Sequence, residues 1–325
     1  MIIVFVETDA DGVTLFSREA LTFARGFGER YGHAAQAVVV GKPTDAVLAH
    51  LGEQGVAVAH HPDDERLSKY SAAAWAAAIA DVVKSAAADL LVASGTPRGN
   101  EIAAHVAARL DVTMAANVVQ ADSAEPLVVT RQVVGGAAQE EMRLDGRPAV
   151  LTVAGHACEA QAAASPEQSE VVTFAPTVSD RDLLPQVARV EQTEAEDTGA
   201  LTGAKVVVGA GRGVGGADGF AELLDLTALL GGALGVSRVV TSLGWRPHSE
   251  QVGQTGSRIS PDLYVACGIS GAIQHWAGCQ SAKNILAINT DPDAPMVTKA
   301  HYAAIGDLHE IVPAINDELR KRLGR

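Results

Sequence analysis

Apolar runs alternate with helical patterns along almost the whole chain. In the first half, continuous apolar segments predict buried strands at 2–7, 34–41 and 89–95. Apolar residues that recur every three or four positions predict helices at 17–30, 71–88 and 98–110, and Ser17 is expected to cap the first of them. Continuous apolar strands separated by helices are typical of a mostly parallel sheet that is covered on both faces.

The segment 125–155 has a different pattern. Its β-branched runs are interrupted by Gly135-Gly136 and by Asp145-Gly146, which are sequences typical of turns. This pattern predicts antiparallel strands added to the same sheet.

A polar, acidic segment at 187–203 separates the two halves of the chain and contains few large apolar residues. We expect a domain at 1–190, a linker at 191–204 and a second domain at 205–325. In the second domain the pattern predicts strands at 205–210, 237–242, 262–268 and 284–290, with a last short one near 303–312. It predicts helices at 218–231, 270–280, 296–301 and 313–322. The predicted fold class is therefore α/β, with two doubly wound domains.

Length and composition support two compact domains. A chain of 325 residues is longer than one hydrophobic core usually serves, and 47% hydrophobic against 20% charged residues excludes a largely disordered chain. The net charge of −14 argues against general nucleic-acid binding. Residues 1–200 contain 14 basic and 28 acidic side chains, whereas residues 201–325 contain 11 of each. The second half is thus suited to an anionic ligand, or the acidic first half simply keeps the protein dispersed.

Three cysteines without a CxxC motif or zinc-like spacing indicate neither a disulfide scaffold nor a metal site. The apolar stretch at 72–83 is too short to span a bilayer, and the chain opens on a strand pattern without a leader. We expect a cytoplasmic protein with no membrane insertion.

The motif G-x-G-x-x-G, formed by Gly211, Gly213 and Gly216, follows the strand at 205–210. Glycines in this context let the backbone approach a phosphate at the amino end of a helix. A nicotinamide site also expects an acidic residue at the end of the next strand, and 237–242 lacks one. Arg212 inside the turn favours an anionic group.

Other predicted strand ends also present polar residues. Arg238 is either a surface charge paired with a carboxylate or a cation held over a ligand. The loop 245–261 is either a ligand loop or an ordinary solvated loop. Ser270 is expected to cap the next helix, and His275 is either a structural histidine or a donor to an anion. The end of the strand at 284–290 presents Asn289 and Asp291, and Asp307 is expected to accept a hydrogen bond from a ribose or adenine group.

The runs YVACGISGAIQHWAGC (264–279) and INTDPDAP (288–295), with GAGRG upstream and YAAIGDLHEIVPAI downstream, resemble the alpha subunit of electron transfer flavoprotein, FixB type. The resemblance is strongest over 205–325. It implies an adenine-nucleotide-hydrolase-like first domain without bound AMP, and a Rossmann-like second domain that binds FAD.

The resemblance also implies a role for each matching residue. Arg212 and Ser237 would contact the diphosphate or nearby groups, and Arg238 would lie beside the isoalloxazine ring. The ring would be lined by Val252, Gly253, Gln254 and Thr255. The next stretch would comprise Ser270, Gly271, Ala272, Ile273, Gln274 and His275. The adenosine end would be held by Asn289, Asp307 and Leu308.

The family's activity implies a carrier of electrons without substrate turnover and without a catalytic acid, base or nucleophile. Its partner is a beta subunit that holds a structural AMP. Electrons would arrive from primary dehydrogenases such as the acyl-CoA dehydrogenases of fatty acid beta-oxidation and leave to a membrane quinone oxidoreductase. Two alternatives stay open: a stand-alone nicotinamide- or flavin-dependent oxidoreductase, and a non-redox module that binds adenine nucleotides.

Overall fold

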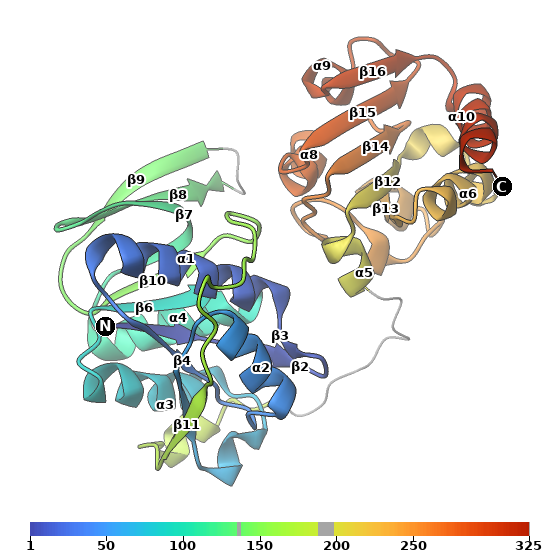
Figure 1. Cartoon of the computed structure of the whole chain (residues 1–325). Coiled ribbons are helices and arrows are strands. Elements are labelled where there is room, and N and C mark those ends of the chain that lie inside the picture. The colour runs from blue at the N-terminus through green and yellow to red at the C-terminus, as the bar shows by residue number, and fades with distance from the viewer. Residues whose placement is uncertain (135–137, 188–197, 325) are drawn as a thin grey trace. The chain divides into compact units, whose positions relative to one another are not determined.

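The computed structural model describes residues 1–134, 138–187 and 198–324, and the chain forms two compact units, Met1–Val190 and Glu191–Arg325 (Figure 1). Most of the segment predicted as a linker, 191–197, lies outside the described residues, as does the predicted turn Gly135-Gly136. Within the rest of that segment, Thr198–Gly203 form the helix α5.

Nine strands form one sheet among the described residues of the first unit, in the order β11-β5-β4-β1-β6-β10-β7-β8-β9. Pairing is parallel from β11 to β7 and antiparallel from β7 to β9. The strands are β1 (Ile2–Phe5), β4 (Ala35–Val38), β5 (Val58–Pro62), β6 (Leu90–Ser94), β7 (Met114–Ala124), β8 (Leu127–Val133), β9 (Ala138–Leu144), β10 (Ala149–Val153) and β11 (Glu170–Phe174). A separate small ribbon pairs β2 (Thr8–Asp9) with β3 (Gly12–Val13).

Helices cover both faces of this sheet (Figure 1). They are α1 (Leu15–Tyr31), α2 (Asp45–Glu53), α3 (Ala72–Ser85) and α4 (Pro97–Leu110), with short 3-10 turns at Glu65–Ser68 and Asp180–Leu183. Successive residues of a strand point to opposite faces. Accordingly, Ile2 and Val4 pack with the apolar residues of α1 and α2, whereas Ile3 and Phe5 pack with those of α3 and α4.

Two predictions for the first unit are wrong in part. The segment 125–155 does contain the antiparallel strands β8 and β9, but β10 is parallel to both of its neighbours. All five residues of β10 are buried, and a fully buried apolar run is typical of an interior parallel strand. Ser17 does not cap α1. The N-cap is Thr14, whose Oγ1 accepts from the Ser17 backbone N–H, while Ser17 Oγ accepts from the backbone N–H of Glu7 at 2.9 Å.

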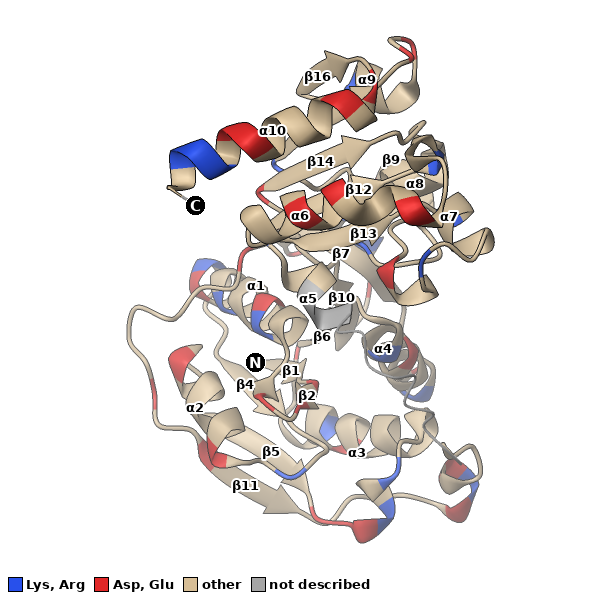
Figure 2. Cartoon of the chain, turned by 90° about the vertical axis from the view of Figure 1, so that its right-hand side faces the viewer, with Lys and Arg blue, Asp and Glu red and all other residues tan. Residues whose placement is uncertain are grey.

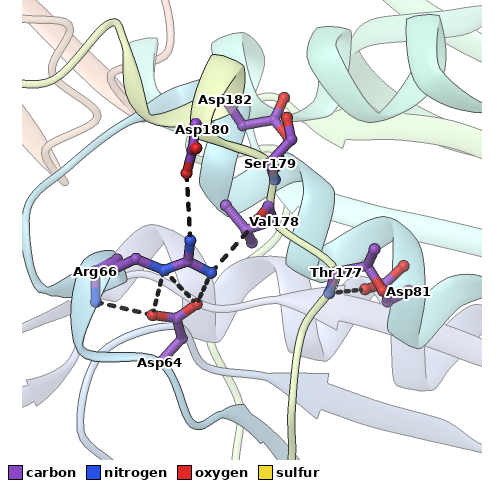
Figure 3. Close-up of polar contacts among 8 residues, drawn as sticks. All are labelled: Asp64, Arg66, Asp81, Thr177, Val178, Ser179, Asp180 and Asp182. Carbon is purple, nitrogen blue, oxygen red and sulfur yellow. Dashed lines mark hydrogen bonds and ion pairs between the residues drawn. The ribbon is translucent and has the colours of Figure 1, made fainter.

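The segment that follows β11 is fastened to the first unit by charged contacts (Figure 3). The guanidinium of Arg66 contacts Asp64 at 2.7 Å and Asp180 at 3.9 Å. Asp81 on α3 accepts from the backbone N–H of Thr177 at 2.6 Å. These contacts hold residues 177–180 against the elements that carry Asp64 and Asp81.

The second unit is built on a five-stranded, wholly parallel sheet in the order β13-β12-β14-β15-β16, among the residues that the structure describes. The strands are β12 (Val206–Ala210), β13 (Ala233–Val236), β14 (Leu263–Cys267), β15 (Asn284–Asn289) and β16 (Tyr302–Ile305). The helices after α5 are α6 (Ala221–Leu229), α7 (Arg238–Ser242), α8 (Ile273–Cys279), α9 (Pro295–Lys299) and α10 (Leu308–Leu323), with 3-10 turns at Arg212–Val214, Ala217–Phe220 and His248–Glu250.

The helices of the second unit pack on opposite faces of its sheet. Apolar residues of α6 and α10 join Val208 and Ala210 in one cluster, and residues of α5, α8 and α9 join Val207 and Tyr264 in another. This arrangement is doubly wound, as the alternating sequence pattern predicts. The last turn of α10 carries Arg320, Lys321 and Arg322, seen as a blue helix end in Figure 2, where positive charge offsets the partial negative charge of a helix terminus.

The segment 237–242 is a helix, not the predicted strand. The second sheet position is filled by Ala233–Val236, so Val239, Val240 and Thr241 have no strand to pair with and their β propensity is overridden. Ser237 becomes the N-cap of α7. As a result, Ser237 and Arg238 lie at the carboxyl end of a strand rather than at its start.

Two helix starts also differ from the prediction. Ser270 does not cap α8, because Gly271 adopts a left-handed φ of +82° and the helix begins only at Ile273, with Ala272 as its N-cap. The terminal helix begins at Leu308 rather than at 313. Asp307 is its N-cap and accepts from the His309 N–H at 2.9 Å. The last strand therefore ends at Ile305.

No helix within the described residues is long and apolar enough to cross a membrane. Over the same residues, no three His, Cys, Asp or Glu side chains gather in a way that could hold a metal ion.

Candidate functional site

A cavity of about 620 Å³ lies at the carboxyl edge of the second unit's sheet. Residues that end or follow each of the five strands line it: Ser237 after β13, Arg212 after β12, Ser270 after β14, Asn289 at the end of β15, and Asp307 after β16. Ligands of open parallel sheets bind at this edge, and the volume is within the range of small-molecule sites.

A smaller cavity of about 230 Å³ in the first unit is a weaker candidate. It is lined by Ile2, Leu90 and Ala149, which begin parallel strands, so it lies at the opposite edge of its sheet. Its charged groups already pair with one another. Asp89 accepts from the Met1 amino group at 2.7 Å and from Arg147.

Most of the residues predicted for the site line the larger cavity. These eleven are Arg212, Ser237, Arg238, Ser270, Gly271, Ala272, Gln274, His275, Asn289, Asp307 and Leu308. The other five, which do not line it, are Val252, Gly253, Gln254, Thr255 and Ile273. The cavity is also lined by residues that the sequence did not single out: Val239, Gly268, Ile269, Thr290 and Ala294.

The loop from Val252 to Thr255 packs beside α8. The backbone N–H of Gln254 donates to the carbonyl of Gln274 at 2.8 Å. Thr255 Oγ1 accepts from Gln251 Nε2 at 3.0 Å. The loop is thus next to the segment that lines the cavity, and its contact with a ligand stays a prediction.

Two glycines of the G-x-G-x-x-G motif are required by the protein's own packing. A Cβ at Gly211 would lie 2.1 Å from the carbonyl oxygen of Gly268, and one at Gly213 would lie 2.7 Å from the Gly268 Cα. Nothing lies within 4 Å of a Cβ built at Gly216. Gly211 and Gly213 therefore let the loops after β12 and β14 touch, and of the three motif glycines only Gly213 lines the cavity.

The cavity carries positive charge at one end and negative charge at the other. Arg238 and Arg212 follow β13 and β12, and neither guanidinium group has a hydrogen-bond or ion-pair partner among the described residues. Arg238 is thus not the paired surface charge that the sequence allowed. At the β15 and β16 end, Asp291 and Asp307 present carboxylates. An elongated ligand with an anionic part and a part rich in hydroxyl donors fits this distribution of charge.

Two buried polar atoms on the cavity wall have no hydrogen-bond partner among the described residues. They are Ser237 Oγ and His275 Nδ1. An unsatisfied buried polar atom costs roughly 1–3 kcal/mol, so such atoms are normally paired by a ligand or by water. Both residues line the cavity, which fits a bound molecule with hydrogen-bonding groups.

His275 is a neutral side chain in this environment. It is 7% exposed, and burial lowers its pKa to about 4, an effect that the nearby Val252 carbonyl opposes only in part. Its Nε2 lies 2.8 Å from the hydroxyl of Tyr264. The ring therefore offers the cavity a polar atom but no fixed positive charge.

Comparison with known protein families shows to which family the chain belongs. The electron transfer flavoprotein domain matches residues 2–192, and the electron transfer flavoprotein FAD-binding domain matches residues 200–280. The chain belongs to the electron transfer flavoprotein alpha-subunit family. The alpha subunit of Mycobacterium leprae is 36% identical over 325 residues, 99% of each chain. That of Thermoanaerobacterium thermosaccharolyticum is 32% identical over 93% of this chain and 92% of the relative. Protein FixB of Bradyrhizobium diazoefficiens is 32% identical over 98% of this chain and 88% of the relative.

The resemblance deduced from YVACGISGAIQHWAGC and INTDPDAP is thereby confirmed. The electron transfer flavoprotein FAD-binding domain begins at α5 and extends to Gln280, so it includes the strand ends that carry Arg212, Ser237, Arg238 and His275. A role in flavin-based electron transfer follows for the family member described here.

Proposed function

We propose that the chain is the FAD-binding alpha subunit of a heterodimeric electron transfer flavoprotein and that FAD occupies the cavity at the carboxyl edge of the second sheet. One observation carries the proposal. Eleven of the residues expected to bind FAD, from all five strand ends, line a single cavity with two unpaired cations at one end and carboxylates at the other.

The order of strands suggests how FAD would lie. Arg238 follows the edge strand β13, Arg212 follows the adjacent β12, and Asn289 and Asp307 belong to β15 and β16. The isoalloxazine ring would lie by Arg238 and His275, with the loop from Val252 to Thr255 beside it. The diphosphate would lie by Arg212 and Ser237, since unpaired guanidinium groups favour phosphate. Leu308 and the acceptors Asn289 and Asp307 would hold the adenosine.

Bound flavin supplies one-electron chemistry, and the protein adjusts how readily electrons enter and leave. Arg238 adds an unpaired positive charge to the cavity wall, which favours added negative charge nearby. His275 contributes a hydrogen-bonding nitrogen whose solvation by water is already lost through burial. Among the described residues that line the cavity, none forms a hydrogen-bonded nucleophile–base pair, which suits a carrier better than an enzyme with its own substrate.

The partners follow from the same proposal. A beta subunit that holds a structural AMP would complete the heterodimer, and the first unit of this chain would bind no AMP. Electrons would come from primary dehydrogenases, such as the acyl-CoA dehydrogenases of fatty acid beta-oxidation, and pass to a membrane quinone oxidoreductase. The protein would work in the cytoplasm.

Co-expression of this chain with a candidate beta subunit tests the proposal. The purified complex should show a flavin absorption band and contain one FAD per heterodimer. An acyl-CoA dehydrogenase with its substrate should reduce that FAD, and the complex alone should not oxidise acyl-CoA. Oxidation of a substrate by the chain without any partner would instead indicate a stand-alone oxidoreductase, and a colourless complex that binds AMP would indicate a nucleotide-binding module.

A further inference from the structure

Tyr264 lies directly behind His275. The tyrosine is fully buried on β14 and does not line the cavity, whereas His275 on α8 does. The tyrosine hydroxyl and His275 Nε2 are 2.8 Å apart, and the tyrosine side chain has no other hydrogen bond among the described residues. The Val252 carbonyl also interacts with the imidazole and opposes the lowering of its pKa by burial. His275 therefore has one nitrogen, Nε2, with the tyrosine as its partner. The other, Nδ1, is a buried atom without a well-aligned hydrogen bond, in a residue that lines the cavity.

The position of the hydroxyl is fixed by packing. A Cβ at Gly209 on β12 would lie 2.3 Å from the Tyr264 hydroxyl oxygen and 2.5 Å from its Cζ, so the ring occupies the space over a glycine. Val207, Ala266 and Cys279 belong to the same buried cluster. A buried aromatic ring confined in this way cannot turn its hydroxyl to another partner without opening the core.

The direction of the hydrogen bond follows from the donors and acceptors available. If Nε2 carried the proton and donated to the tyrosine, the Tyr264 O–H would be a fully buried donor without an acceptor among the described residues. If the hydroxyl donates to Nε2, both groups are satisfied and the proton of the neutral ring is on Nδ1. The second arrangement avoids the larger cost, because an unpaired buried donor is expensive.

Two further facts agree with this direction. Burial raises the pKa of Tyr264 well above its usual value, so the hydroxyl keeps its proton. The neighbouring thiols Cys267 and Cys279 have pKa values raised by burial to about 12, so no thiolate competes for that proton.

We propose that Tyr264 is a positioning residue: its hydroxyl donates to His275 Nε2 and thereby fixes the neutral ring as the Nδ1–H form, which presents an N–H donor to FAD. This inference rests on the proposed FAD site, but the tautomer of the His275 ring can be measured in this chain itself. It explains why a histidine without positive charge can still favour added negative charge in the cavity.

The test reads the tautomer directly. The full chain, purified with FAD and with the polypeptide that accompanies it, is labelled with ¹⁵N-histidine, and the His275 ring signals are identified by their loss in His275→Gln. We expect a neutral ring protonated at Nδ1. Tyr264→Phe keeps the aromatic ring over Gly209 but removes the donor, and should convert His275 to the Nε2–H form or to a mixture. Tyr302→Phe, at an exposed tyrosine on β16, should change nothing.

The reduction potential of bound FAD is a second readout. Loss of an oriented donor in Tyr264→Phe should disfavour the reduced form about tenfold, or roughly 59 mV for one electron, and Tyr302→Phe should leave the potential unchanged. A wild-type ring protonated at Nε2, or an unchanged tautomer in Tyr264→Phe, overturns the inference. If Tyr264→Phe does not fold, the tautomer of His275 measured in the wild-type protein tests the inference by itself. A chain that binds no FAD refutes the proposed function instead, and the ring's protonation is then still measurable.

Discussion

The ring of Tyr264 fits against β12 only because residue 209 is glycine, since a methyl group there would lie 2.3 Å from the tyrosine hydroxyl oxygen. Gly209 thus sets the place of the group that contacts His275. Gly209→Ala should lower the free energy of unfolding by about 1–3 kcal/mol, because the added methyl forces a buried ring to move. Denaturant unfolding measures this change.

Gly216→Ala is the matched control for Gly209→Ala. The same methyl group at residue 216 meets nothing within 4 Å, and the backbone there is extended. Its free energy of unfolding should stay within about 0.5 kcal/mol of the wild type. Equal effects of the two substitutions would contradict the packing described for Tyr264.

Arg238→Ala removes an unpaired positive charge from the cavity wall. The reduction potential of bound FAD should fall by on the order of tens of millivolts, because added negative charge loses a favourable interaction. Lys321→Ala removes the same charge from the far end of α10, about 20 Å along the helix from Leu308 at the cavity. A redox titration should show a much smaller shift for Lys321→Ala, and equal shifts would mean that Arg238 does not lie near the flavin.

The stability of the second unit should depend on the proton equilibrium of His275. Burial lowers the pKa of His275 from 6.5 to about 4, so between these values the unfolded chain binds a proton that the folded chain excludes. The stabilisation is fully present above pH 6.5 and is lost as the pH falls toward 4. From pH 7 to pH 5 the FAD-free protein should lose roughly 2 kcal/mol.

Fluorescence of a Trp75→Phe background isolates this effect, because Trp245 and Trp276 then report on the second unit alone. His275→Gln in that background should remove most of the difference between pH 7 and pH 5. The Asp262 carboxyl, whose pKa is lowered chiefly by its hydrogen bond to Lys283, affects stability only at more acidic pH. A pH dependence that is unchanged by His275→Gln would show that the ring is not buried as described.

The three cysteines should be unreactive in the folded protein. Burial raises the pKa of Cys158 to about 11 and those of Cys267 and Cys279 to about 12, so few thiolates form at pH 8. A thiol reagent should modify less than one cysteine in native protein and all three after denaturation. Rapid modification of two or more native thiols would contradict this burial.

Much of the second unit could be predicted from the sequence, because its strands are continuous apolar runs and the polar residues that follow them meet at one edge. The helix at 237–242, which replaces a predicted strand, could not be predicted. Both Ala233–Val236 and Val239–Thr241 are apolar enough to form a strand, and only the packing of the sheet selects the first of them. Ser237 and Arg238 reach the cavity because the structure places them after the carboxyl end of β13, whereas the start of a parallel strand would lie at the opposite edge of the sheet.

The contact between Tyr264 and His275 also could not be predicted from the sequence. Both residues lie in the motif YVACGISGAIQHWAGC, but their pairing depends on how far α8 is displaced from β14 by the left-handed turn at Gly271. Likewise, the glycines Gly211 and Gly213 resemble a phosphate-binding turn in sequence, whereas the structure uses them for a backbone contact with Gly268. Close approach of two backbones leaves the same glycine signal as close approach to a ligand.

FAD content after purification reports whether FAD binds in the cavity at the carboxyl edge of the second sheet. Ala272→Trp places a large side chain in the cavity, while Ala303→Trp places the same side chain at an exposed position of β16 that does not line it. The wild-type complex and Ala303→Trp should each contain one FAD, and Ala272→Trp should contain little or none while remaining folded. Full FAD content in a folded Ala272→Trp protein would show that FAD does not bind in this cavity.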